Sequence, residues 1–136
     1  MRTYSKGART ERELMLMLQN NGYSVMRSAG SGVNSITPDI IAVRKGRGLA
    51  FECKAWEKSN ITFEREKIDV LKEWQSNTMM DTFIGWRSNG SGWLFISLGE
   101  LAPTGKGYII TRRNALAIGR KFDEMVQQNA IAQKAD

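Results

Sequence analysis

Two short apolar segments joined by a glycine-containing turn constrain this fold more than any other feature of the sequence. Residues 39–43 and 49–55 are rich in Ile, Val, Ala and Phe, and residues 44–48 between them include Gly46 and Gly48. The first group of residues favours strands, and glycines in so short a connection permit a tight reversal of the backbone. The sequence therefore predicts an antiparallel β-hairpin here.

The rest of the chain alternates between helical and extended patterns. Apolar residues at helical spacing predict helices over residues 10–20, from near Thr62 to before Asp81, and over residues 114–128. Further strands are expected over residues 23–27, 82–86 and 93–96, with one more edge strand at 108–110. The order α β β β α β β (β) α predicts a single α/β domain over residues 1–136, with a central mixed sheet of about five strands flanked by α-helices. We expect the tail over residues 130–136 to be frayed.

The absence of histidine and the single cysteine restrict the chemistry of the chain. Without histidine, the Ser-His-Asp and Cys-His arrangements and His-ligated zinc are excluded. Hydrolysis must then use carboxylates, lysine and arginine, and a metal held by carboxylate oxygens would be Mg²⁺, for which Mn²⁺ substitutes. Cys53 cannot form an internal disulfide, which favours the reducing cytoplasm.

The balance of charge favours an anionic partner. Twenty Lys and Arg residues against fourteen Asp and Glu residues give a formal net charge of +6. Cations that neutralise phosphates release condensed counterions, so nucleic acid is the expected partner, although many basic proteins bind none. No apolar run approaches the ~20 residues needed to cross a bilayer, and no apolar stretch follows the N-terminus, so we expect neither a membrane partner nor a secretory signal.

The predicted hairpin brings chemically useful groups together. Glu52 and Lys54 are two residues apart on one strand and share a face, while Asp39 begins the neighbouring strand. Two carboxylates on a half-buried face are costly unless a cation neutralises them. Asp39 and Glu52 are therefore candidate magnesium ligands, with the backbone carbonyl of Cys53 completing the shell. Lys54 is a candidate for orienting water or stabilising charge on a phosphate.

Glu11 is a third candidate acid. It precedes Leu14, Met15 and Leu18 by three, four and seven residues, so it lies on the apolar stripe of the first helix. Near the N-terminal turn it could reach the same metal cluster, or it could simply compensate the helix dipole. The side chain of Cys53 is expected to be a small group facing the core, and the four tryptophans are expected to anchor the core or an interface.

Four segments in order resemble the archaeal Holliday junction resolvases, within the restriction-endonuclease-like PD-(D/E)XK superfamily. They are Lys6-Gly-Ala-Arg-Thr-Glu-Arg-Glu-Leu14, Arg27-Ser-Ala-Gly-Ser-Gly32, Pro38-Asp-Ile-Ile41 and Phe51-Glu-Cys-Lys54. The resemblance is strong over residues 4–56 and weak after Gly99. It implies a structure-selective endonuclease that makes paired symmetric nicks in four-way DNA.

The resemblance also implies roles for individual residues. Glu11, Asp39 and Glu52 match the metal-binding acids, and Lys54 matches the catalytic lysine. The further catalytic matches are Arg12, Arg27 and Ser31. The residues expected to contact DNA are the cations Lys6, Arg9, Arg12, Arg27, Arg44, Lys45 and Arg47.

The family is a two-fold homodimer, which suits the two-fold shape of branched DNA. Two other readings remain open from the residues: another endonuclease of the same superfamily, of nicking or restriction type, and a non-catalytic basic DNA-binding module. Cleavage of a four-way junction but not of linear duplex would distinguish a resolvase from a nicking or restriction-type enzyme. Cleavage that depends on magnesium would distinguish a nuclease from a non-catalytic module.

Overall fold

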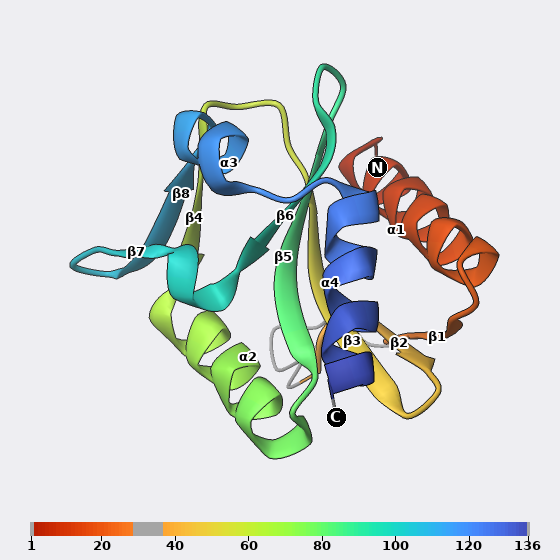
Figure 1. Ribbon diagram of the computed structural model, residues 1–136. Coiled ribbons are helices and arrows are strands. Elements are labelled where there is room, and N and C mark those ends of the chain that lie inside the picture. Colours follow the sequence, from red (N-terminus) through yellow and green to blue (C-terminus); the bar gives the residue numbers. More distant parts are fainter. Residues whose placement is uncertain (1, 29–36, 136) are drawn as a thin grey trace.

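A five-stranded mixed sheet runs through the middle of the molecule (Figure 1). The computed structural model describes residues 2–28 and 37–135. The strands of this sheet lie in the order β1-β2-β3-β5-β6, and only the pairing of β3 with β5 is parallel. The strands are β1 (Ser24–Arg27), β2 (Ile40–Arg44), β3 (Arg47–Ala55), β5 (Asp81–Ser88) and β6 (Gly92–Ser97). The predicted fold class, a central mixed sheet of about five strands flanked by helices, is confirmed.

Helices cover both faces of the central sheet. The helices are α1 (Arg2–Asn20), α2 (Arg65–Thr78), α3 (Arg112–Ile118) and α4 (Phe122–Ala135), with a short 3₁₀ turn η1 (Leu98–Glu100). Helices α1 and α4 lie over one face, and α2 lies over the other (Figure 1). No helix within the described parts of the chain is both long and apolar enough to span a membrane. Helix α4 continues through Ala135, and the fraying expected over residues 130–136 stays a prediction.

The two faces of the sheet bury separate apolar clusters. Leu14 and Leu18 of α1 pack with Phe51, Phe95 and other residues between the sheet and helices α1 and α4. On the other face, Ile84, Trp86 and Ile96 of the sheet pack with residues of α2, α3 and a second sheet. Successive residues of a strand point to opposite faces. Phe51 and Cys53 therefore belong to the α1 side, whereas Glu52 and Lys54 point to the α2 side.

The predicted hairpin forms between β2 and β3. Arg44 and Arg47 are the last paired residues, and Lys45 and Gly46 between them have φ values of 51° and 81°. Positive φ at both central residues is typical of the two-residue turn whose twist matches that of the strands. Gly46 adopts this conformation at no steric cost. The hairpin fixes the register that places Asp39 beside β3.

The helix predicted to start near Thr62 begins later, which corrects that prediction. Residues Asn60–Glu64 form strand β4, in which Ile61 and Phe63 are buried and Thr62 is exposed. Helix α2 begins only at Arg65, and its N-cap residue Glu64 makes no side-chain capping bond. Thr62 resembles an N-cap in the sequence, but its neighbours alternate between buried and exposed as in a strand.

A second sheet, not predicted, explains this difference. Strand β4 pairs with β8 (Gly107–Thr111), and β8 pairs in turn with β7 (Ala102–Pro103). The strand expected at residues 108–110 therefore exists, but it is the central strand of a three-stranded sheet and the edge assignment was wrong. Between β3 and β5 the chain passes through β4 and α2. The first turn of α2 lies over the face of β3.

The single helix predicted over residues 114–128 is in fact two helices. Thr111 caps α3 by accepting a hydrogen bond from the amide of Asn114 at 3.1 Å. Gly119 then adopts an extended conformation, and Arg120 forms a β-bridge with Phe95 before α4 begins. The backbone hydrogen bonds of Arg120 to β6 replace those of a continuous helix. The prediction was wrong because this break depends on a contact with a distant strand.

Candidate active site

Asp39 is held against the backbone of β3. Its amide donates to the carbonyl oxygen of Phe51 at 2.9 Å, and its Oδ2 accepts a hydrogen bond from the amide of Cys53 at 2.8 Å. These two bonds extend the β2–β3 register by one residue and fix the carboxylate beside Glu52 and Lys54. Because Ile40 pairs with Phe51, Asp39 lies across from Glu52, as the sequence predicts.

Glu52 is a buried acid with an unsatisfied oxygen. The residue is only 6% exposed, and its Oε1 has no hydrogen-bond partner. The Nζ atom of Lys67, in the first turn of α2, lies 3.4 Å from this oxygen and forms a long ion pair with it. Burial, followed by the nearby charge of Asp39, raises the pKa of Glu52 to about 7. A buried carboxylate next to a second acid is stabilised in its ionised form by a nearby cation.

The environment of Asp39 has the same character. Burial raises the pKa of Asp39, and it outweighs the lowering effects of the Cys53 amide and of the charges of Lys67 and Lys54. The two acids therefore oppose each other's ionisation while two lysines favour it. Such a pair of perturbed carboxylates is typical of a functional site.

Glu11 lies at the margin of this pair. Arg27 Nε donates to Glu11 Oε1 at 2.7 Å, and the Glu11 side chain is 19% exposed. Burial raises the pKa of Glu11, the Arg27 hydrogen bond lowers it, and the charge of Asp39 raises it. In the described residues no three acidic side chains lie close enough to form a complete metal cage. Glu11 is thus near Asp39 but is directed to Arg27.

The position of Glu11 removes one of its two interpretations. Helix α1 begins at Arg2, eight residues earlier than the predicted start at Thr10. Glu11 is therefore not in the first turn, where an acid interacts with the helix dipole, and that effect fades within a turn. Its partly buried position and its ion pair with Arg27 remain as the local reasons for an acid here.

Lys54 and Cys53 leave β3 on opposite sides. Lys54 Nζ lies 5.9 Å from the centroid of the Phe63 ring, and its charge lowers the pKa of both Asp39 and Glu52. The Cys53 side chain packs against the cluster under α1, as predicted, and burial raises the pKa of its thiol. The role of the Cys53 carbonyl as a metal ligand stays a prediction.

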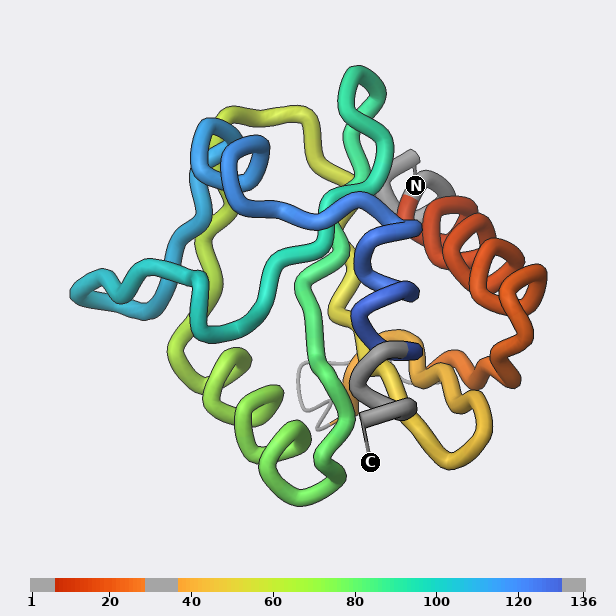
Figure 2. The backbone as a smooth tube through the Cα atoms, in the orientation of Figure 1, coloured from red at the N-terminus to blue at the C-terminus, as the bar shows by residue number. Residues whose placement is uncertain are grey.

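The other predicted residues are spread more widely. Arg12 is exposed on α1. Arg44, Lys45 and Arg47 lie at the β2–β3 turn, the end of the hairpin away from Asp39, roughly 16 to 20 Å along the strands at ~3.3 Å per residue. Figure 2 shows this turn at the opposite end of the molecule from the β5–β6 turn. Ser31 and the side chain of Lys6 lie outside the described residues.

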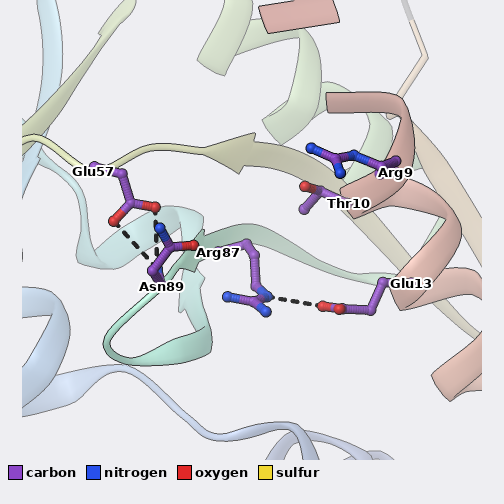
Figure 3. Close-up of a pocket in the computed structure, with 6 residues that line it drawn as sticks. All are labelled: Arg9, Thr10, Glu13, Glu57, Arg87 and Asn89. Carbon is purple, nitrogen blue, oxygen red and sulfur yellow. Dashed lines mark hydrogen bonds and ion pairs between the residues drawn. The ribbon is translucent and has the colours of Figure 1, made fainter. Parts of the chain in front are cut away.

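Arg9 lines a separate polar cavity of about 260 Å³ (Figure 3). Across from Arg9 on α1 are Glu57 and the β5–β6 turn, where the amide of Asn89 donates to the Glu57 carboxylate. Arg87 Nε donates to Glu13 Oε1 at 2.8 Å, and this bond lowers the pKa of Glu13. This ion pair links α1 to β5 beside the cavity. The cavity is distinct from the site formed by Asp39 and Glu52.

Lys67 is the site residue that the sequence analysis missed. Its distance from Asp39 and Glu52 in the sequence hides it, because its place depends on how α2 packs over β3. One signal was available: Lys67 precedes the buried Leu71 by one turn and adjoins the buried Ile68, so it borders the apolar stripe of α2.

The Asp39–Glu52 pair could hold a divalent cation. Mg²⁺ is commonly held by one or two carboxylates with water and substrate phosphates, and it needs no cage of three protein acids. The unsatisfied, buried Oε1 of Glu52 is the observation that fits a cation at this place. With Lys54 and Lys67 beside the pair, the arrangement suits an anionic substrate such as a phosphodiester.

Comparison with known proteins gives concordant results. The sequence profile of the family described as archaeal Holliday junction resolvase (Hjc) matches residues 2–133. The chain is 39% identical over 117 residues to the crossover junction endodeoxyribonuclease Hjc of Methanocaldococcus jannaschii, covering 85% of this chain and 84% of that protein. It is 28% identical over 130 residues to the Hjc of Sulfolobus acidocaldarius, covering 93% and 90%.

Solved structures agree on the fold. The structure of Archaeoglobus fulgidus Hjc, a Holliday junction resolvase, superposes with a TM-score of 0.78 at 23% identity, covering 88% of this chain and 94% of that one. A bacterial homing endonuclease superposes with a TM-score of 0.56 at 13% identity, covering 98% and 99%. At these identities the two likenesses bear on the fold alone.

Proposed function

The chain belongs to the archaeal Holliday junction resolvase family, and from this premise we propose that Asp39 and Glu52 hold the Mg²⁺ ion with which it cleaves four-way DNA. It is a crossover junction endodeoxyribonuclease, an enzyme that hydrolyses phosphodiester bonds in branched DNA. The metal dependence belongs to the family, and the choice of Mg²⁺ with substitution by Mn²⁺ rests on the oxygen ligands. The observation that carries the proposal is the buried, unsatisfied Oε1 of Glu52 beside Asp39.

The residues of the site divide the work of hydrolysis. A divalent ion bound by Asp39 and Glu52 supplies Lewis-acid polarisation of the phosphoryl group and lowers the pKa of water. Lys54 projects from the same face of β3 as Glu52 and provides a fixed positive donor for the attacking water or the developing phosphoryl charge. The Cys53 amide keeps the Asp39 carboxylate oriented through its 2.8 Å hydrogen bond. The Cys53 carbonyl is proposed as a further ligand.

The remaining residues are proposed to bind DNA around the scissile bond. Arg27 is held by Glu11 at the margin of the acidic pair, and Arg12 is exposed on the adjoining helix. We assign both to phosphates and Glu11 to the outer part of the metal site, and we propose a catalytic role for Ser31 on the family resemblance alone. The further DNA contacts proposed are Lys6, Arg9, Arg44, Lys45 and Arg47. Phosphate contacts of this kind recognise backbone shape, with little reading of base sequence.

A homodimer is the proposed assembly. A four-way junction is nearly two-fold symmetric, so two sites related by one axis can nick two opposed strands. The reducing cytoplasm remains the proposed compartment, on the ground of the single cysteine.

A labelled four-way junction and a linear duplex of the same arm sequence test the function. With Mg²⁺ we expect the junction to be converted into two nicked duplexes while the linear duplex remains intact. Chelation by EDTA should abolish cleavage, and Mn²⁺ should restore it. Equal cleavage of both substrates would favour a nicking or restriction-type nuclease, and binding without any Mg²⁺-dependent cleavage would favour a non-catalytic module.

Replacing Arg27 tests the proposed phosphate contacts. We expect Arg27→Ala to slow cleavage roughly tenfold to a hundredfold, the scale of one charge-assisted hydrogen bond. The slope of log Kobs for junction binding against log salt should become about 0.9 less steep, as for one lost phosphate contact. Single-turnover cleavage and binding titrations at several salt concentrations measure the two effects.

Lys106→Ala is the matched control for Arg27→Ala. It removes the same charge from the exposed β7–β8 turn, which lies on the far side of the molecule from α1 (Figure 1). An Arg27→Ala protein with the cleavage rate and salt slope of the Lys106→Ala protein would contradict the assignment of Arg27.

A further inference from the structure

A second lysine enters the site from a different element than Lys54. Lys67 is the third residue of α2, and its side chain spans the space between that helix and β3. Its ammonium lies 3.4 Å from Glu52 Oε1, and the side chain is 28% exposed while that of Glu52 is 9% exposed. The contacted oxygen is the same atom that has no hydrogen bond. Lys67 therefore lies beside the oxygen that is proposed to bind the metal.

Counting charges shows what this contact means for a divalent ion. When both are ionised, Asp39 and Glu52 contribute two negative charges, and the nearby Lys54 and Lys67 contribute two positive charges. The set is neutral without any metal. A divalent ion added to the set would leave two excess positive charges, which is costly where water is largely excluded. The cost falls if one ammonium moves away or if a phosphate arrives.

Of the two lysines, Lys67 is the one that we expect to move away from the acids when a divalent ion binds. It is the lysine in ion-pair contact with Glu52, and the 3.4 Å distance between Nζ and Oε1 is long for a charge-assisted bond. Its four-carbon side chain is partly exposed at the start of a helix, so its ammonium can swing to solvent or to a bound phosphate. Lys54, in contrast, extends from the central strand and lies over the Phe63 ring.

We propose that Lys67 is the internal counter-ion of the site: in the DNA-free protein its ammonium holds the Glu52 oxygen that a divalent ion requires, and the ion must displace it. This inference rests on the proposed metal site. Lys67 is a positioning residue, because it acts through Glu52. A DNA phosphate that attracts the displaced ammonium makes binding of the ion easier, so metal and DNA favour each other's binding, as linkage requires.

The test measures Mg²⁺ binding to the DNA-free protein. Mg²⁺ is titrated into ¹⁵N-labelled protein at pH 8.5 and followed by NMR at the Cys53 amide, which donates to Asp39. We expect Lys67→Met to bind Mg²⁺ about tenfold more tightly than the wild type, the order expected when a charge a few ångströms away is removed. Lys67→Arg keeps the charge and should retain the wild-type affinity.

Lys72→Met is the matched control. It removes the same charge from the same helix, but its Nζ donates to the hydroxyl of Tyr108 at 3.1 Å and does not contact the acids. Its Mg²⁺ affinity should equal that of the wild type. A Lys67→Met protein that binds Mg²⁺ equally or more weakly than the wild type would overturn the inference, because a purely structural role predicts no gain.

Glu52→Gln distinguishes failure of the inference from failure of the metal site. If Glu52→Gln loses Mg²⁺ binding while Lys67→Met matches the wild type, the proposed metal site stands and the role of Lys67 is refuted. If Glu52→Gln binds Mg²⁺ like the wild type, or if neither the wild type nor Lys67→Met binds the ion, both proposals fall. Thermal melts of every variant in EDTA verify that each is folded.

Discussion

The Asp39→Asn protein should bind a four-way junction as tightly as the wild type and leave it uncut. Asn retains an oxygen that can accept the hydrogen bond from the Cys53 amide, so the local fold should survive. It removes the negative charge that shares a divalent ion with Glu52. We expect the single-turnover rate to fall by about a thousandfold or more, the upper range for losing one group that stabilises the transition state.

Binding and cleavage must be measured separately to interpret this variant. Removing a negative charge cannot weaken attraction to phosphates, so the dissociation constant in EDTA should be unchanged or slightly lower. Asp69→Asn, an exposed acid on α2, is the matched control and should cleave normally. A folded Asp39→Asn protein that still cuts the junction, or that no longer binds it, would refute the assigned role.

Glu52→Gln should make the metal-free protein more stable at pH 8 while abolishing cleavage. The pKa of Glu52 is about 7 in the folded protein and 4.5 as its ordinary value. The folded state therefore prefers the protonated acid, and this contribution to stability is fully present below pH 4.5 and is lost as the pH rises through 7. At about 1.4 kcal/mol per pH unit, the ionised side chain costs the fold on the order of 3 kcal/mol.

Urea unfolding in EDTA at pH 5 and pH 8 measures this effect. Between the two values, the free energy of unfolding of the wild type should fall on the order of 2–3 kcal/mol further than that of Glu52→Gln, because the amide does not ionise. Comparing the two proteins cancels the titration of other groups. Saturating Mg²⁺ should restore the wild type at pH 8 but not the variant. Equal pH dependence in both proteins would show that Glu52 is not held in an unfavourable environment.

The parts of the fold that depend on neighbours in the sequence were predictable. The hairpin of β2 and β3 follows from Gly46 and the apolar segments on either side, and these residues meet within one turn of the chain. Strand β4 was mistaken for the start of a helix because its partner, β8, comes about 45 residues later. The break at Gly119 likewise depends on the contact of Arg120 with Phe95. Short segments carry little signal when a distant strand decides their conformation.

The same distinction holds for the site. Asp39, Glu52 and Lys54 lie on one hairpin, so alternation along the strands was enough to bring them together. Lys67 was missed because its place depends on how α2 packs over β3, which no local pattern specifies. Glu11 was expected in a first helical turn, yet α1 starts at Arg2 and carries it into the helix interior. The family resemblance named Glu11 and Arg27 but could not reveal that they bind each other.

The central place of β3 has a consequence for how the site can move. From Leu49 to Phe51 this strand is paired with β2 on one side and with β5 on the other, and the part that carries Glu52 and Lys54 continues beside β5. In deuterated solvent the amides of Leu49 to Phe51 should exchange only when the entire domain opens, later than those of β1 at the rim of the sheet. The strand that carries the proposed site is therefore anchored in the middle of the sheet, and we expect adaptation to a branched substrate to occur in the DNA or in peripheral segments of the protein.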